Sequence, residues 1–266
     1  MRPILFTKME GTGNDFVLVD NREGMLNEII KSGDLSGFAR RALDRNLGIG
    51  GDGLIIVGVE QNYPFGMRYF NHDGSESDLC LNGCRCLVSY AFRLGLLQDK
   101  GKFMTAAGPI GFFYKDGVVS IEVMPPVDIK MNLALTVNRK KMKVHFLKVG
   151  VPHCVVFVES YDDLNIEELG RIIREHKTFK PEGTNVSFVK QEGKSIFVRT
   201  YERGIEGETL SCGSGVLTSA YIAVKLMYIP SPVSCKTRGG ELIVTIKDKL
   251  YLEGPTHFVF DGLYYV

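Results

Sequence analysis

The stretch "NGCRCLVSYAFRLGLL", residues 82–97, is as long as a helix and apolar around most of its circumference. Helices with this pattern are usually buried inside a protein. A second stretch of the same kind, "GSGVLTSAYIAVKLMY", follows at residues 213–228. A cysteine precedes each stretch, Cys80 the first and Cys212 the second. The sequence therefore predicts two buried helices, each introduced by a thiol.

The surroundings of the two cysteines repeat each other. A glutamate lies four residues before each cysteine and a glycine three residues after it (Glu76, Glu208, Gly83 and Gly215). A strand-like run precedes each motif, at residues 66–70 and 195–201, and the segments 7–20 and 147–159 form a second similar pair. Repetition at such spacings indicates two similar halves, and "MPPVDI" (124–129) supplies a break between them.

The remaining segments alternate apolar and polar residues, as short strands do, at residues 103–124 and 241–255. Turns are expected at "KDG" (115–117) and "KDK" (247–249). We therefore expect an α+β fold of two pseudo-symmetric halves, each a curved, barrel-like, mostly antiparallel sheet around a central buried helix. The expected halves are residues 1–125 and 126–255, with the active site in the cleft between them. The C-terminal strand at 256–266 is a candidate to complete the first half.

Composition narrows the classes of function. The chain has 266 residues, of which 44% are hydrophobic and 24% charged, and its net charge is +1, so attraction to nucleic acid or to a membrane is not expected. The start, "MRPILFTKMEG", turns polar too early for a signal peptide, and no apolar run is long enough to span a membrane. Six cysteines in this context predict reduced thiols and a cytoplasmic location. The expected partner is a small molecule, with a homodimer as a candidate assembly.

"GIGGDG" at residues 48–53 matches the glycine pattern of dinucleotide-binding loops. Such a loop needs a strand before it and a helix after it. Here a helix-like run at 38–47 precedes the glycines, and a strand-like run at 54–60 follows them. The pattern is therefore interpreted as a tight helix-to-strand connection.

The two anchor cysteines stand where helices begin. Free N–H groups and the helix dipole at that position favour a thiolate and bind carboxylates. The segment "CGSG", from Cys212, would let a carboxylate approach the backbone closely because glycines flank Ser214. Two such thiols, one in each half, suit proton exchange at a stereocentre: one removes the proton from one face and the other returns a proton to the opposite face.

The cysteines have other possible roles in metal binding and in the core. A structural zinc site is disfavoured because no second C-x-x-C pair occurs, although a site that joins Cys80 and Cys84 to His72 or His153 stays open. Four other cysteines are interpreted as inert core side chains, two within the first apolar helix and two in strand-like runs (Cys84, Cys86, Cys154 and Cys235).

The chain resembles diaminopimelate epimerases almost from end to end, which are amino-acid epimerases that need no cofactor. Seven stretches carry the resemblance in order: "FTKMEGTGNDFVLVD" (6–20), "LDRNLGIGGDGL" (43–54), "FNHDGSESDLCLNGCRC" (70–86), "PHCVVFV" (152–158), "GTNVSF" (183–188), "YERGIEGETLSCGSG" (201–215) and "GPTHFVFDG" (254–262). The resemblance implies an isomerase that interconverts LL- and meso-2,6-diaminopimelate for lysine and peptidoglycan synthesis. No metal or other cofactor is implied.

The resemblance also implies roles for residues. Cys80 and Cys212 match the two catalytic cysteines. Positions that match substrate-binding residues are Asn14, Asn71, Leu81, Asn82, Asn185, Glu202, Arg203, Gly213 and Ser214. Among these, the backbone N–H of Leu81 and the groups of Asn82, Gly213 and Ser214 would hold the carboxylate at the reacting centre, and the fork of Arg203 suits a carboxylate at the far end of the substrate. His153 matches an auxiliary histidine, for which a purely structural role is the alternative.

Two departures from the family pattern affect recognition of the substrate. Leu81 stands where a glycine is common, and Val151 where an asparagine is common. One alternative is therefore a cofactor-independent racemase for another amino acid, such as histidine or proline. A second is a ligand- or metal-binding relative without enzymatic activity.

Overall fold

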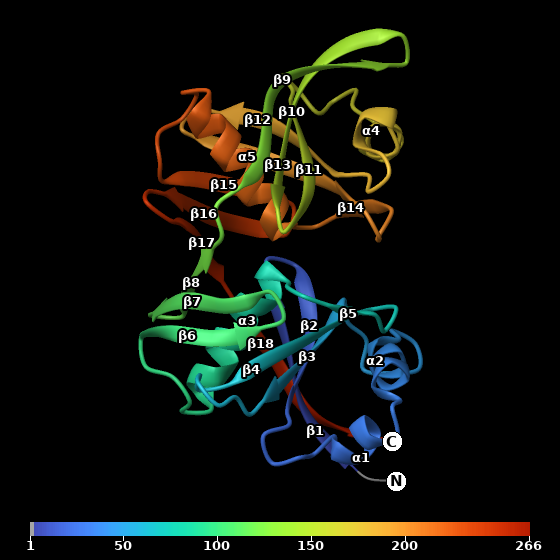
Figure 1. Cartoon of the computed structure of the whole chain (residues 1–266), viewed down its shortest axis with the longest axis vertical. Helices are drawn as coiled ribbons and strands as arrows, with labels where there is room; N and C mark the ends of the chain where they lie inside the picture. Colours follow the sequence, from blue (N-terminus) through green and yellow to red (C-terminus); the bar gives the residue numbers. More distant parts are fainter. Residues whose placement is uncertain (1–2) are drawn as a thin grey trace. The chain divides into compact units, whose positions relative to one another are not determined.

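The computed structural model describes residues 3–266 and divides into two compact units. The first unit comprises the residues up to Glu122 together with Gly254–Val266, and the second comprises Val123–Glu253. Figure 1 shows both units, each with strands around one long helix, α3 in the first and α5 in the second.

In the first unit, the helix that follows Cys80 lies among strands that come mostly from the N-terminal part of the chain. Strand β2 pairs in parallel with β3, whereas β1 pairs antiparallel with both β18 and β2, and β3 pairs antiparallel with β4. The elements of this unit are β1 (Pro3–Gly11), β2 (Asn14–Asp20), α1 (Asn27–Lys31), α2 (Leu35–Leu43), β3 (Gly53–Gly58), β4 (Gly66–Asn71), β5 (Glu76–Ser77), α3 (Leu81–Arg93), β6 (Lys100–Thr105), β7 (Gly108–Lys115), β8 (Val118–Val123) and β18 (His257–Tyr265).

The second unit repeats this pairing scheme. Strand β11 pairs in parallel with β12, β10 pairs antiparallel with β9 and β11, and β12 pairs antiparallel with β13. Its elements are β9 (Val127–Val137), β10 (Lys140–Val149), β11 (Val151–Phe157), α4 (Ile166–Arg174), the 3-10 helix η1 (Lys177–Phe179), β12 (Asn185–Glu192), β13 (Ser195–Glu202), β14 (Gly207–Thr209), α5 (Gly213–Lys225), β15 (Val233–Thr237), β16 (Gly240–Ile246) and β17 (Leu250–Pro255).

The shared pairing scheme makes the two units pseudo-symmetric. In both, a short antiparallel strand follows the fourth strand of the series, and that fourth strand also pairs in parallel with the strand after the central helix. A three-stranded antiparallel run begins with β6 in the first unit and with β15 in the second. The predicted α+β fold of two similar, mostly antiparallel halves around central helices is confirmed.

Helices α3 and α5 are the buried helices that their apolar sequences predict. Helix α3 is buried from Leu81 through Ala91 and packs on β1, β2, β3 and β7. Helix α5 packs on β10–β13, β15 and β16. Both end earlier than their apolar patterns, because Gly95 and Met227 adopt positive φ angles of 72° and 56° directly after the last turn.

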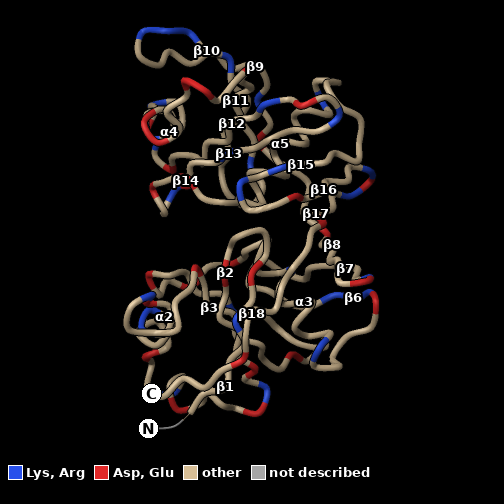
Figure 2. The backbone as a smooth tube through the Cα atoms, turned by 180° about the vertical axis from the view of Figure 1, so that it is seen from behind, with Lys and Arg blue, Asp and Glu red and all other residues tan. Residues whose placement is uncertain are grey.

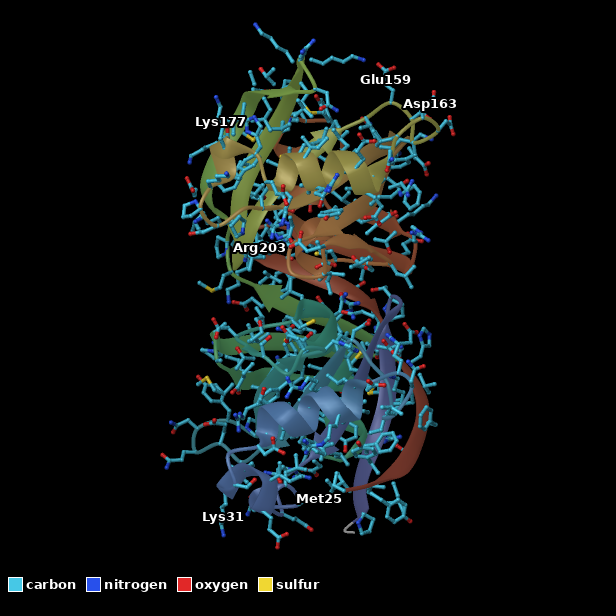
Figure 3. The ribbon with its side chains drawn as sticks, turned by 90° about the vertical axis from the view of Figure 1, so that its right-hand side faces the viewer. Met25, Lys31, Glu159, Asp163, Lys177 and Arg203 are labelled. Atoms are coloured by element: carbon cyan, nitrogen blue, oxygen red, sulfur yellow. The ribbon has the colours of Figure 1, made fainter. Side chains whose placement is uncertain are left out.

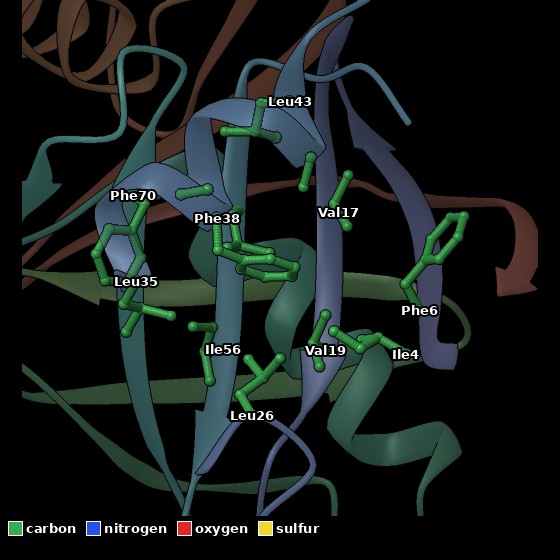
Figure 4. Packing of buried hydrophobic residues seen from close by; sticks show 13 residues of the cluster. Ile4, Phe6, Val17, Val19, Leu26, Leu35, Phe38, Leu43, Ile56 and Phe70 are labelled. Carbon is green, nitrogen blue, oxygen red and sulfur yellow. The ribbon is translucent and has the colours of Figure 1, made fainter. Parts of the chain in front are cut away.

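A second helix lies on the outer face of each sheet. In the first unit, α2 packs on β3 and β4, and Figure 4 shows Phe38 and Leu43 of α2 against Val17 and Ile56 of the strands. Such packing buries the apolar face of the sheet opposite α3, so each sheet is covered on two sides. Helix α4 packs in the same way on β12 and β13.

The predicted turns are in place. Asp116 and Gly117, at φ 51° and 83°, form the two-residue turn between β7 and β8 that "KDG" predicts, and residues 247–249 connect β16 to β17. The "GIGGDG" segment connects α2 to β3, as its inverted context predicts. However, the helix before it is Leu35–Leu43 rather than 38–47, because the chain becomes extended at Asp44 (φ −61°, ψ 125°).

Charges of both signs are interspersed over each unit, and Figure 2 shows basic residues gathered at the tip of the β9–β10 hairpin. Within residues 3–266, no helix is long and apolar enough to cross a membrane.

Candidate active site

Cys80 is the N-cap residue of α3. Its backbone is extended (φ −130°, ψ 113°), and its Sγ accepts a hydrogen bond from the Gly83 N–H at an N···S distance of 3.4 Å. The thiol is partly exposed. Unpaired N–H groups at a helix start favour negative charge, so this position suits both a thiolate and a bound carboxylate.

Two predicted amides surround this thiol. Asn82, in the first turn of α3, donates from Nδ2 to Oδ1 of Asn14 at 3.3 Å, and the same Oδ1 lies 3.9 Å from Sγ of Cys80. Asn14 begins β2 and donates from Nδ2 to Asp52 at 2.6 Å. The structure therefore brings Cys80, Asn14 and Asn82 together at one helix start.

Leu81 and Asn71 complete the first-unit predictions. Leu81 is the first residue of α3 and is buried, so its backbone N–H is at the helix start while its side chain lies in the interior. Asn71 ends β4 opposite Gly53, and its side chain donates to Ser75 Oγ at 3.0 Å within the following turn. Asn71 thus lies at the sheet end where β2 and β3 begin, and its side-chain bond to Ser75 stays within its own turn.

Cys212 has the equivalent place in the second unit, as the N-cap residue of α5 (φ −105°, ψ 107°). It is buried, with Sγ 3.5 Å from Oγ of Ser214. Gly213 begins the helix, and Gly215 allows it to approach the sheet, because a Cβ there would lie 2.8 Å from Ser187 Oγ. The thiol and the candidate carboxylate-binding turn of "CGSG" are therefore adjacent.

The surroundings of Cys212 favour its neutral form. Burial raises the pKa of this thiol well above its usual value, and the nearby carboxylate of Glu202 raises it further. Hydrogen bonds from Ser214 and the Gly215 N–H act in the opposite direction but do not reverse the shift in this pKa. Glu202 ends β13 and accepts a hydrogen bond from the Thr209 hydroxyl. Cys212 is consequently a thiol near neutral pH.

Arg203 and Asn185 form a second polar group in this unit. The backbone N–H of Arg203 donates to Oδ1 of Asn185 at 2.8 Å, and its guanidinium Nη1 donates to the backbone oxygen of Glu182 at 2.7 Å. Arg203 directly follows β13 and is labelled in Figure 3. The guanidinium keeps donors available for an anion, because one of its five N–H groups is used by the contact with Glu182.

His153 is fully buried on β11, opposite Asn185 of β12. Neither of its ring nitrogens has a hydrogen-bond partner among residues 3–266. Burial, assisted by the positive charge of Arg203, lowers the pKa of His153 from 6.5 to about 3. The imidazole is therefore neutral at neutral pH, so one of its ring nitrogens can donate a hydrogen bond and the other can accept one.

The glutamates that precede the two cysteines have equivalent partners. Glu76 receives two hydrogen bonds from Arg68 of β4, at 2.6 and 2.8 Å, and Glu208 receives two from Arg199 of β13, both at 2.7 Å. Each pair fixes the short strand that leads to the helix-capping cysteine. The repeated glutamate spacing signalled these pairs, but the arginine partners could not be identified from the sequence.

Sequence reasoning missed two further residues near Cys80. Asp52 lies within the glycine-rich connection and accepts hydrogen bonds from Asn14 and Arg45. Arg85 is fully buried in α3 and donates to Asn82. A signal existed for Arg85, since a charged residue within an otherwise apolar helix needs buried partners.

The remaining cysteines are buried, and burial raises the pKa of each thiol. Cys84 lies 3.8 Å from Sδ of Met67, a contact between two apolar core side chains. Among residues 3–266, no group of three or more His, Cys, Asp or Glu side chains is arranged to hold a metal ion.

The sequence comparisons with known proteins agree on one family. The sequence profile of the family described as "Diaminopimelate epimerase" matches residues 6–125 and 145–259. The diaminopimelate epimerase of Hydrogenobaculum sp. (strain Y04AAS1) is 38% identical over 271 residues, covering 98% of both chains. That of Aquifex aeolicus (strain VF5) is 38% identical over 270 residues, covering 97% of this chain and 96% of its own.

A solved structure supports the fold independently. The crystal structure of the Bacillus anthracis phenazine biosynthesis protein of the PhzF family superposes with a TM-score of 0.74 at 15% identity, covering all of both chains. At this identity the likeness concerns the fold alone.

Proposed function

The chain belongs to the diaminopimelate epimerase family, and we propose that Cys80 and Cys212 are the two acid/base groups of its reaction. The protein is an epimerase that acts without pyridoxal phosphate and interconverts LL- and meso-2,6-diaminopimelate, in the pathway to lysine. One observation carries the assignment of the residues: in each of two pseudo-symmetric units, a cysteine caps the central buried helix.

The proton transfer needs one thiolate and one thiol. The thiolate removes the α-proton from one face of the substrate and becomes a thiol, while the electron pair left at the α-carbon spreads into the adjacent carboxylate. The second thiol then donates its proton to the opposite face and becomes the thiolate. The configuration is inverted, and the protonation states of the two cysteines have exchanged.

The helix starts would stabilise the charge that develops on the carboxylate. Backbone N–H groups of residues 81–82 and 213–214, together with the side chains of Asn82 and Ser214, are the donors we assign to it. Such donors help catalysis because the carboxylate carries more charge in the transition state than in the substrate.

We assign the far end of the substrate to the second polar group, with Arg203 as the partner of the distal carboxylate. Asn185 supports that role by holding the Arg203 backbone. We further assign Glu202 to the substrate ammonium or to proton exchange with Cys212, whose thiol it influences. We assign Asn14 and Asn71 to polar contacts that the first unit makes with the substrate.

We also propose that the protein works in the cytoplasm, where thiols stay reduced. Within residues 3–266 no disulfide joins the cysteines, which supports this location.

The test is epimerisation in deuterated solvent. Purified protein is expected to convert LL-diaminopimelate to the meso form and to introduce deuterium at the α-carbon, without added cofactor. Cys80→Ala and Cys212→Ala should each abolish the conversion, whereas Cys86→Ala and Cys235→Ala, which remove other buried thiols, should retain it.

A panel of histidine, lysine and proline under the same conditions tests the substrate. Faster α-exchange with one of these amino acids than with diaminopimelate would assign a different substrate, to which Leu81 and Val151 would then be adapted.

A further inference from the structure

Arg85 is a fully buried cation whose partners belong to the Cys80 site. Its Nη1 donates to Oδ1 of Asn82 at 2.9 Å, and its Nη2 donates to Oγ1 of Thr12 at 3.0 Å. Thr12 in turn donates to the backbone oxygen of Gly11 at 2.7 Å. A buried guanidinium is costly to desolvate, so its retention within an apolar helix calls for a role.

The hydrogen bonds that start at Arg85 run in one direction. An arginine can only donate, and an ionised aspartate can only accept, so the amides between them have a single consistent orientation. Arg85 donates to Asn82, Asn82 donates to Asn14, and Asn14 donates to Asp52. The chain of hydrogen bonds therefore keeps the Nδ2 group of Asn82, rather than its oxygen, on the side of Asn14, whose Oδ1 lies 3.9 Å from Sγ of Cys80.

The second unit has neither an arginine in the place of Arg85 nor an asparagine in the place of Asn14. At the spacing of 132 residues that relates Cys80 to Cys212, the counterpart of Arg85 is Leu217. The strand registers align Asn14, the partner of Gly11, with Val151, the partner of Val149. Instead of a nearby cation, Cys212 has the carboxylate of Glu202. The pseudo-symmetric backbone thus carries opposite charges near its two thiols.

We propose that Arg85 is a positioning residue that turns the amide N–H groups of Asn82 toward the substrate carboxylate and makes Cys80 the thiolate of the resting pair. This inference rests on the proposed two-thiol function and specifies how that function starts. From the resting state, Cys80 removes a proton first and Cys212 donates one.

The charges around Cys80 support this direction. The groups that act electrostatically on Arg85 are Glu10 of β1 and the cysteines of α3, including Cys80. The attraction between the guanidinium and the Cys80 thiolate is mutual, so it favours the thiolate. Cys84 and Cys86 stay neutral because burial raises their pKa values, which leaves Arg85 as the charged neighbour on the helix.

The first experiment measures thiol ionisation without substrate. The rate of iodoacetamide alkylation at Cys80 and at Cys212 is followed by peptide mass spectrometry across pH. The pH at which the alkylation rate reaches half of its maximum, called the midpoint, is expected to be lower for Cys80 than for Cys212. Arg85→Met should raise the Cys80 midpoint by about one pH unit, a roughly tenfold lower thiolate fraction at neutral pH. Arg93→Met, at the exposed end of the same helix, should leave it unchanged.

The second experiment measures epimerisation of diaminopimelate. Arg85→Met should raise KM and lower kcat/KM at least tenfold in both directions. Arg85→Lys keeps the charge, so its Cys80 midpoint should stay close to that of the parent protein. Because it loses the fork of the guanidinium, its KM should still rise. It also serves as the readout if Arg85→Met fails to fold, which thermal unfolding would reveal.

An unchanged Cys80 midpoint in Arg85→Met, or a lower midpoint at Cys212 than at Cys80 in the parent protein, would overturn the proposal. Because alkylation needs no substrate, these results stand even if the parent protein fails to epimerise diaminopimelate, which would instead refute the proposed function.

Discussion

At the scale of single residues, the two thiols share a backbone position but not an environment. Cys80 is partly exposed with Arg85 on its helix, whereas Cys212 is buried beside Glu202. Equal backbone geometry therefore does not imply equal protonation. This difference fits a reaction that needs one thiolate and one thiol at its start.

His153 provides a prediction about acid stability. Its pKa is about 3 in the folded protein against an ordinary 6.5, so between these values the unfolded chain binds a proton that the folded chain excludes. Stability should therefore fall as pH decreases through this window, by up to about 1.4 kcal/mol per pH unit from this group.

His153→Gln removes the titration but keeps a polar side chain. Urea unfolding at pH 7 and pH 4.5 should show that the parent protein loses about 2 kcal/mol more than the variant over this interval. Equal losses would mean that His153 is protonated, or solvated, in the folded state.

Residue chemistry was only partly predictable from the sequence. Cys80 and Cys212 could be identified because a thiol before an apolar helix is a local pattern. Asp52 and the Thr12 partner of Arg85 could not be placed near Cys80, because the Asn14–Asp52 contact joins residues 38 apart in the chain and the Arg85–Thr12 contact joins residues 73 apart.

At the scale of elements, α3 and α5 end in the same way with different residues. The N–H of Leu96 bonds to the oxygen of Ala91, and the N–H of Tyr228 bonds to that of Ala223, both at 3.0 Å. The residue before each donor adopts positive φ, and it is a glycine in α3 but Met227 in α5. This conformation is unfavourable for a residue with a Cβ.

Met227→Gly should therefore stabilise the protein by about 0.5–1 kcal/mol, because the side chain of Met227 is 90% exposed and contributes little packing. The reciprocal change Gly95→Ala should destabilise it by a similar amount. Chemical denaturation of both variants checks the pair, and a destabilised Met227→Gly protein would show that the exposed side chain makes contacts that matter.

The ends of elements illustrate the limit of sequence patterns. The apolar patterns at residues 82–97 and 213–228 continue past the helices, because Leu96 and Tyr228 fold back after the positive-φ residue. Periodicity shows which face of a helix is apolar. The end of a helix depends on backbone angles, and a methionine at position 227 does not predict a positive φ.

At the scale of the whole molecule, the repeat was the most informative sequence signal. Weak matches at a spacing of 132 residues predicted two units with one topology, and the strand pairings show that topology in both. The turn after β13 is one residue longer than the turn after β4. The number of residues between the strand and the following cysteine therefore differs by one between the two units. Strand partners themselves depend on long-range pairing that the sequence does not display.

The C-terminal strand supports the homodimer as a proposal. Strand β18 exposes apolar side chains on both faces, with Phe260 49% and Leu263 54% accessible, and β1 exposes Leu5 beside it. Exposed apolar strands in soluble proteins commonly mark contact surfaces. We therefore expect a dimer of the 29.6 kDa chain in solution.

Light scattering after size-exclusion chromatography tests this assembly. Leu263→Lys should shift the protein toward the monomer. Leu47→Lys, which changes an exposed leucine outside β1 and β18, should not. A parent protein that is monomeric at micromolar concentration, or a Leu263→Lys variant that stays dimeric, would place the contact elsewhere or remove it.

The central claim is that one thiol from each unit serves one face of the same α-carbon, and isotope exchange in the single variants tests it most directly. A lone thiolate can remove a proton, exchange it with solvent and return deuterium to the same face. Cys80→Ala and Cys212→Ala should therefore each lose epimerisation but exchange the α-hydrogen of opposite epimers, one of the LL and the other of the meso form. Cys212→Ala, which keeps Cys80, should exchange at neutral pH, whereas Cys80→Ala should exchange only at a higher pH that ionises Cys212, whose pKa is raised by burial. Continued epimerisation in either variant, or exchange of the same epimer by both, would contradict the account.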